Sequence, residues 1–193
     1  MSDAPTWVMR GEVLGPRPAA AGLERGLPPS WEQVLARLAG EWSWQEAPLA
    51  VVGEGERFAG SIRDLAQAFD IAVALSLRLW PQRIRVGVGK GALARARKQR
   101  LPFALELGAE APAATVALIE QAARLHAAQL ARWKPSRLAA VQAIRRAPRQ
   151  RDAAELLGIR QQSVSTALRA AMAKELAGLE DAIRVQLRAL AGN

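Results

Sequence analysis

The sequence predicts an α+β protein in which residues 1–114 form a small sheet with helices and residues 115–193 form an all-helical domain. In the first part, strand-like segments alternate with helical ones, and this order favours a small sheet with helices on one face. From Thr115 onward no strand pattern appears, and alanine, leucine and arginine dominate the sequence. We therefore expect the domain boundary between residues 110 and 135, within or along a linking helix, and set it after residue 114.

A strand and a helix open the first part. Residues 7–14 are strand-like and end at Gly15-Pro16, and the proline- and glycine-rich residues 16–29 predict a loop. Ser30 is placed to cap a helix. The apolar residues of this helix recur at helical spacing: Trp31, Val34, Leu35, Leu38 and Trp42.

Two more strands flank a second helix. Residues 49–52 predict a short strand that enters a glycine-containing turn at residues 53–58. We expect Ser61 to begin a helix that ends before Pro81, since proline disfavours the helical conformation in the residue before it. The alternation of apolar and other residues over 84–88 predicts a further strand. The expected apolar face of the second helix comprises Ile62, Leu65, Ala66, Phe69, Val73, Leu77 and Trp80.

Helices fill the second part. One helix is expected from Thr115 to about Trp133, and Pro135 separates it from a shorter helix over residues 136–146. Pro148 then interrupts the chain again.

The last helix, over residues 174–190, has one apolar stripe whose members are three or four residues apart: Leu176, Leu179, Ile183, Leu187 and Leu190. We expect this stripe to pack against its own domain. The alternative is that this helix, or the helix over residues 115–133, forms the seam of a dimer.

Composition excludes several classes of protein. The chain has no cysteine and one histidine, His126, which excludes disulfide frameworks, zinc fingers and histidine-cluster metal sites. His126 lies among alanines in a helical stretch, where we expect a surface or packing role. No apolar run is long enough to span a membrane, and residues 1–10 do not resemble a secretory signal. We therefore expect a cytoplasmic protein with no membrane partner.

The positive charge is concentrated near the end of the chain. The net charge is +9, and residues 1–123 contribute 14 basic and 13 acidic side chains. Residues 124–193 contribute 13 basic and only 5 acidic side chains. This asymmetry favours a polyanionic partner for the second part. The alternative is an arginine-rich surface that has no such partner.

Residues 150–170 match a helix-turn-helix, in which two helices are joined by a tight turn. Ala154 is small at the place where the two helices cross closely. Gly158 falls at the turn, where a left-handed backbone conformation favours glycine. We expect four apolar residues to bury the turn and hold the second helix on the first: Leu157, Ile159, Val164 and Leu168.

The exposed side of the second helix is predicted to bind double-stranded DNA. No acidic residue occurs between Ile159 and Ala173, and short polar groups with arginine suit base edges and phosphates. The candidate reading residues are Gln161, Gln162, Ser163, Ser165, Thr166 and Arg169. Phosphate contacts are expected from Arg149, Arg151 and Arg160, with Arg145, Arg146 and Lys174 nearby. The alternative is an ordinary helical hairpin with a glycine turn.

Four stretches of the chain resemble the SatD family. They are Gly11-Glu12, the turn Gly-Glu-Arg-Phe-Ala-Gly at residues 55–60, the strand Arg-Val-Gly-Val-Gly at residues 85–89, and the helix-turn-helix at residues 150–168. The resemblance implies an N-terminal domain similar to the palm of nucleotidyl cyclases, which is a ferredoxin-like sheet. It also implies that the helix-turn-helix forms a separate C-terminal domain.

The chain departs from that family pattern at the residues that would bind metal. A cyclase-type palm holds two divalent metals with acidic side chains of the first strand and of the hairpin turn. Here Glu12 replaces an aspartate, and the basic Arg57 follows Glu56 in the turn. A cluster of Glu12, Glu54 and Glu56 is the alternative, but we expect no metal, no cofactor and no catalytic residue. Phe58 is expected in the core.

Three glycines near the third predicted strand allow two interpretations. Gly87, Gly89 and Gly91, together with Lys90, could form a phosphate cradle. The spacing is not that of a Walker motif, and no clearly capped helix follows. We therefore expect these glycines to permit close packing.

Three functions remain open. The first is a non-enzymatic helix-turn-helix transcriptional regulator that binds double-stranded DNA as a homodimer. Its N-terminal domain would be a scaffold or would sense an unknown small-molecule or protein effector. The second is a metal-dependent, cyclase-like enzyme with a DNA-binding tail. The third is a non-specific nucleic-acid-binding interaction module.

Overall fold

The computed structural model describes residues 6–14, 33, 49–52, 57–147 and 149–192. The loop expected at residues 16–29 lies outside these residues. So does the helix expected over residues 31–42, apart from Gln33.

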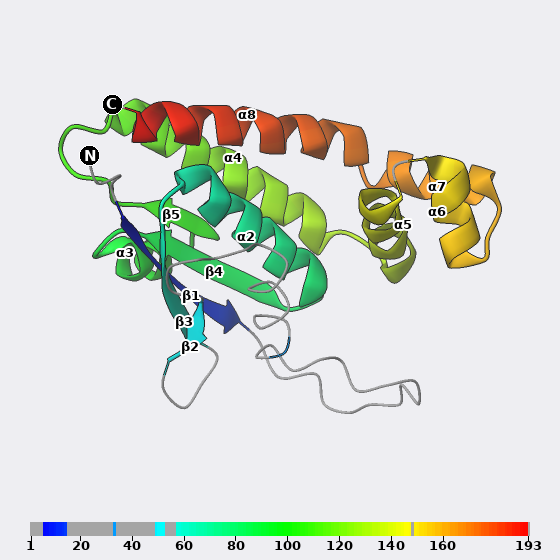
Figure 1. Ribbon diagram of the computed structural model, residues 1–193, viewed down its shortest axis with the longest axis horizontal. Helices are drawn as coiled ribbons and strands as arrows, with labels where there is room; N and C mark the ends of the chain where they lie inside the picture. Colours follow the sequence, from blue (N-terminus) through cyan, green and yellow to red (C-terminus); the bar gives the residue numbers. More distant parts are fainter. Residues whose placement is uncertain (1–5, 15–32, 34–48, 53–56, 148, 193) are drawn as a thin grey trace. The chain divides into compact units, whose positions relative to one another are not determined.

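The first part contains a five-stranded mixed sheet (Figure 1). Its strands are β1 (Trp7–Leu14), β2 (Ala50–Val51), β3 (Arg57–Ile62), β4 (Arg83–Val88) and β5 (Phe103–Leu105), in the order β2-β3-β1-β4-β5. All neighbouring strands are antiparallel except β4 and β5. The first four strands have the order of a ferredoxin-like sheet. The predicted α+β class is therefore confirmed.

Helix α2 (Leu65–Arg78) begins later than the sequence predicted. Asp64 caps it, because its side chain accepts a hydrogen bond of 2.8 Å from the backbone nitrogen of Ala66. Ser61 instead belongs to β3, where it pairs with Val8 of β1. The expectation that Ser61 begins the helix was wrong, because the buried-exposed alternation of the strand continues as far as Ile62.

Helices lie on both faces of the sheet, which corrects the prediction of a single covered face. On one face, the ring of Phe69 in α2 meets the ring of Phe103 in β5 edge-on, with 5.6 Å between centroids. Successive strand residues point to opposite faces, so Ala104 points away from α2. Ala104 forms a buried cluster with Ala92 and Ala96 of helix α3 (Ala92–Gln99), which therefore covers the other face.

The glycines of the Arg-Val-Gly-Val-Gly strand permit close packing, as predicted. A Cβ atom at Gly87 would overlap the backbone of Leu93 in α3. Gly89 has a φ of 110°, and a Cβ atom there would overlap the carbonyl oxygen of Glu106. However, helix α3 does follow the glycines, beginning at Ala92. The sequence did not predict this helix because its N-cap, Gly91, has no capping side chain.

The second part contains five helices: α4 (Ala113–Ala131), α5 (Pro135–Arg146), α6 (Gln150–Leu157), α7 (Gln161–Ala170) and α8 (Ala173–Ala191). The predicted stripe of α8 is covered within the chain: Leu176, Ile183 and Leu187 are buried, and Leu179 and Leu190 are half-buried. This stripe is therefore not a free dimer seam. In the described part of the chain, no helix is both long and apolar enough to cross a membrane.

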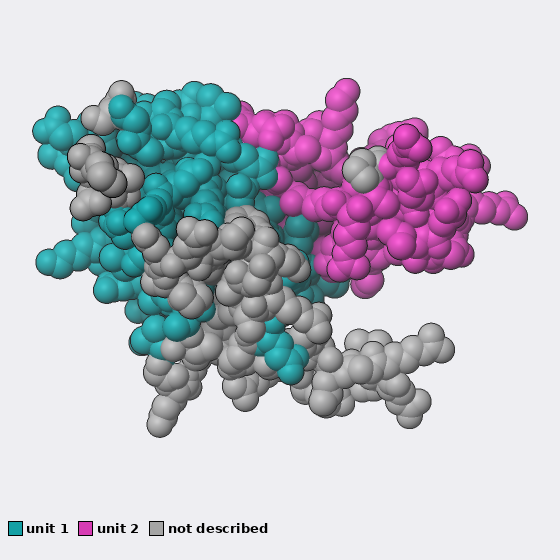
Figure 2. Space-filling view, in the orientation of Figure 1, with its two compact units in different colours: residues 1–124, 183–193 teal, residues 125–182 magenta. Residues whose placement is uncertain are grey.

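The chain divides into two compact units (Figure 2). One unit comprises Met1–Arg124 and Ile183–Asn193, and the other comprises Leu125–Ala182. The division between Arg124 and Leu125 lies inside α4 and within the range of residues 110–135 expected for the boundary, ten residues after the position 114 that we set. A second division, between Ala182 and Ile183, lies inside α8, so α4 and α8 each contribute residues to both units.

Candidate nucleic-acid interface

Helices α5, α6 and α7 form a small three-helix bundle within the unit Leu125–Ala182 (Figure 1). Its core consists of Ala143, Ala153, Ala154 and Val164. Ile144, Leu157 and Leu168 are partly buried against this core. The predicted places of Ala154, Val164 and Leu168 are therefore confirmed. The sequence analysis did not assign α5 to the motif, although Ala140, Val141 and Ala143 mark its buried side.

The turn between α6 and α7 has the predicted backbone conformation. Gly158 has a φ of 64°, which lies in the left-handed region. Its N–H donates to the carbonyl oxygens of Ala154 and Glu155, and the N–H of Ile159 donates to Ala154 at 3.1 Å. These bonds satisfy carbonyls that the end of a helix would otherwise leave unpaired. A Cβ atom at Gly158 would meet no atom within 4 Å, so the requirement for glycine comes from the φ angle alone.

Ile159 does not bury the turn, which corrects the prediction. Its exposed fraction is 46%, and that of Leu156 is 63%. Leu157 is the residue that packs against the core of the bundle. The left-handed conformation at Gly158 reverses the chain directly after Leu157, and Ile159 is left outside the core.

The predicted reading residues lie on the surface of α7. Gln161, Gln162, Ser163, Thr166 and Arg169 are exposed, whereas Ser165 is half-buried. Val164 is fully buried on the inner side of the helix. Five of the six candidates are therefore accessible to a partner.

Basic side chains surround the start of both motif helices. Arg149 is the N-cap of α6 and Arg160 is the N-cap of α7, and neither makes a side-chain capping bond. Both guanidinium groups are exposed, and neither makes an ion pair within the described part of the chain. Free backbone N–H groups at a helix N-terminus favour anions, so a phosphate could contact backbone and guanidinium together.

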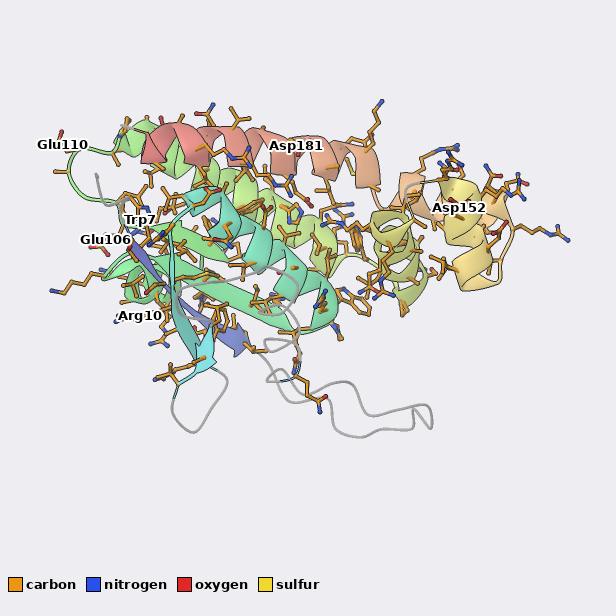
Figure 3. The ribbon with its side chains drawn as sticks, in the orientation of Figure 1. Trp7, Arg10, Glu106, Glu110, Asp152 and Asp181 are labelled. Atoms are coloured by element: carbon orange, nitrogen blue, oxygen red, sulfur yellow. The ribbon has the colours of Figure 1, made fainter. Side chains whose placement is uncertain are left out.

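Acidic side chains offset the positive charge near Arg151. Arg151 pairs with Glu155 at 3.1 Å, and both side chains are exposed. Such a pair contributes little to stability, and a phosphate can compete for the arginine. Asp152, labelled in Figure 3, lies in the first turn of α6.

An ionic network around the buried carboxylate of Glu180 lies in the same unit as the motif. His126 Nε2 on α4 is 2.9 Å from Glu180 Oε1 on α8. Arg145 at the end of α5 donates to the same oxygen at 2.5 Å. Burial raises the pKa of Glu180, but the hydrogen bond from His126 and the charge of Arg145 outweigh it, so the net pKa lies below the usual 4.5.

In this network the partly exposed Arg145, expected near the phosphate contacts, is paired with Glu180. His126 is buried, as a packing role requires. Glu180 was not predicted from the sequence, although a signal was present. Glu180 is four residues after Leu176 and three before Ile183, so it falls inside the apolar stripe of α8.

Trp133 connects α7 to the segment after α4. Its indole Nε1 donates to the carbonyl oxygen of Ala171, the C-cap of α7, at 3.2 Å. Both residues are buried. This bond fixes the C-terminal end of α7 and was not anticipated from the sequence.

Of the three glutamates in the alternative metal site, the structure describes Glu12, which pairs with two arginines. Arg85 donates to Oε1 of Glu12 at 2.5 Å, and Arg97 donates to Oε2 at 2.5 Å. Burial raises the pKa of Glu12, but the hydrogen bonds from Arg97 and Arg85 outweigh it and lower the net pKa. A metal that binds either oxygen of Glu12 would have to compete with a guanidinium group. Glu54 and Glu56 lie outside the described residues.

Two further observations bear on that first unit. Among the residues that the structure describes, no group of three or more acidic, histidine or cysteine side chains could hold a metal. Phe58 is buried as predicted, and its ring packs over Gly11 of the neighbouring strand, where a Cβ atom would overlap it.

No protein-family model matches the chain, and searches of curated proteins and of solved structures found no match.

Proposed function

We propose that this protein binds double-stranded DNA through α7 and acts as a helix-turn-helix transcriptional regulator. One observation carries the proposal. Apart from Ala170 at its end, the exposed side chains of α7 are all polar or basic, while Val164 on its inner side is fully buried in the bundle. Exposed Arg149, Arg160 and Arg169, none of which makes an ion pair within the described part of the chain, add positive charge that an ordinary helical hairpin does not require.

The arrangement of charges supports phosphate contacts around the reading helix. Arg149 and Arg160 lie at the N-termini of α6 and α7, where the helix dipole and free N–H groups also favour an anion. A single motif of this kind reads few bases, so a homodimer on a palindromic site is part of the proposal. The first unit would be a scaffold or would sense an effector. Membership of the SatD family stays a prediction.

The experiment is a selection from a random-duplex pool, followed by affinity measurements over a range of salt concentrations. We expect an enriched palindrome that is bound roughly 10³-fold or more tightly than random DNA at physiological salt. Enrichment of no sequence, with affinity that disappears as salt rises, would reduce the motif to a non-specific clamp. Equal affinity for DNA, RNA and heparin would favour the interaction module instead.

A further inference from the structure

Three of the exposed residues of α7 form one line along the helix. Gln162, Thr166 and Arg169 are four and three residues apart, and all three are exposed. A helix turns by about 100° per residue, so these residues lie about 140–200° from the fully buried Val164. Ser163 and Ser165 lie about 100° from Val164 on either side, and Ser165 is half-buried. The line therefore marks the outermost edge of the helix.

The length of the line fits a short stretch of DNA. With a rise of about 1.5 Å per residue, Gln162 and Thr166 are about 6 Å apart along the axis, and Thr166 and Arg169 about 4.5 Å. Successive base pairs are about 3.4 Å apart. A helix that follows the major groove would thus place the three side chains over about three base-pair steps.

The three side chains differ in chemistry, so the two ends of the line would select different bases. Glutamine forms a bidentate pair with N6 and N7 of adenine, and arginine with O6 and N7 of guanine. The methyl group of threonine packs against the methyl group of thymine. Arg169 makes no ion pair within the described part of the chain, so its guanidinium group is available for a base.

We infer that α7 reads a half-site in which Gln162 selects adenine at one end, Arg169 selects guanine at the other, and Thr166 contacts a thymine methyl between them. The inference rests on the proposed function. Arg149 and Arg160 are assigned to phosphates, because they occupy the N-cap positions of α6 and α7 and lie off this line. Gln161, about 60° from the inner Val164, is assigned no base.

The test exchanges the hydrogen-bonding character of two side chains and measures base preference. Gln162→Glu replaces the NH2 donor of the amide with a second acceptor oxygen, and a carboxylate accepts from N4 of cytosine. Arg169→Gln exchanges the guanine pair for an adenine pair. Gln161→Glu is the matched control, because it introduces the same charge one residue away from the line. All three side chains are exposed, so the thermal unfolding of each full-length variant should match that of the unsubstituted protein.

The selection is repeated with each variant. We expect Gln162→Glu to change adenine to cytosine at one position and Arg169→Gln to change guanine to adenine at a second, each by about 5- to 150-fold in relative affinity. Gln161→Glu should weaken binding to all sequences alike. Unchanged base preferences with a uniform loss of affinity would overturn the inference and make both residues phosphate contacts.

The same experiment separates this inference from the proposed function. If the unsubstituted protein enriches no sequence at all, the proposed sequence-specific function fails together with the inference. If it enriches a palindrome whose preferred bases do not respond to the variants, the function stands and only the assignment of α7 residues to bases fails.

Discussion

The imidazole of His126 and the carboxylate of Glu180 lie 2.9 Å apart and are both buried, although 54 residues separate them in the sequence. Arg145 adds a second bond to the same carboxylate oxygen. Glu180 therefore joins α4 and α5 to α8 within one unit. Through this carboxylate, α8 is hydrogen-bonded to the end of α5, the first helix of the bundle.

The first prediction is that Glu180→Ala destabilises the protein by about 3 kcal/mol, because it leaves the buried His126 and the partly exposed Arg145 without their acceptor. Glu175→Ala is the matched control, since Glu175 is an exposed acidic residue on the same helix. It should change the free energy of unfolding by less than about 0.5 kcal/mol. Denaturant unfolding monitored by circular dichroism measures both. Equal effects of the two substitutions would show that the network does not stabilise the fold.

The second prediction concerns pH. The pKa of Glu180 is lowered below 4.5 in the folded protein, so this group stabilises the folded state at pH values above its unfolded pKa. That contribution is lost as the pH falls through the folded pKa. We expect the free energy of unfolding to decrease as the pH drops below about 4.5, and to decrease less steeply in Glu180→Gln. Parallel pH profiles for the two proteins would contradict the shift.

The third prediction compares two glycines that both have open space around them. Gly158→Ala should destabilise the protein by about 1–2 kcal/mol, because alanine is strained at a φ of 64°. Gly178→Ala lies inside α8 and should stabilise the protein by about 0.5–1 kcal/mol, because alanine favours helix. Thermal unfolding gives both signs. Gly158→Asn should lose less than Gly158→Ala, since asparagine tolerates the left-handed region.

These local relationships explain which features the sequence could predict. Gly158 and Val164 belong to a pattern that lies within about twenty residues, and its helices and turn occur as predicted. Arg83–Val88 was recognised as a strand by the alternation over residues 84–88, and Trp7–Leu14 by its strand-like residues before Gly15-Pro16. Each of these signals is contained in one short stretch of chain.

Other features depend on partners that are distant in the sequence. Helix α3 buries only Ala92 and Ala96, so its apolar pattern is weak, and its position follows from close packing on Gly87. The pairing of Glu12 with Arg97 spans 85 residues, and no local pattern indicates it. Ile159 was assigned to the core because it is apolar, but the direction of the chain after a left-handed residue decides its exposure.

The fourth prediction is that Glu12 is not a metal ligand. Both of its oxygens accept from guanidinium groups, so millimolar Mn²⁺ or Mg²⁺ should give no binding heat and should not raise the melting temperature. Arg97→Ala should lower the melting temperature, because Glu12 then loses one of its two partners. A saturable metal-binding heat that Glu12→Gln abolishes would contradict this prediction and would favour the cyclase-like alternative.

The fifth prediction concerns the salt dependence of DNA binding. If Arg160 contacts a phosphate, Arg160→Ala should weaken binding to all sequences alike and reduce the slope of log affinity against log salt by about one. Arg188→Ala removes the same charge from an exposed position on α8, outside the unit Leu125–Ala182, and should leave the slope unchanged. Fluorescence anisotropy at a series of salt concentrations measures both slopes. Equal reductions in the two variants would mean that net charge, and not the position of Arg160 at the start of α7, determines the interaction.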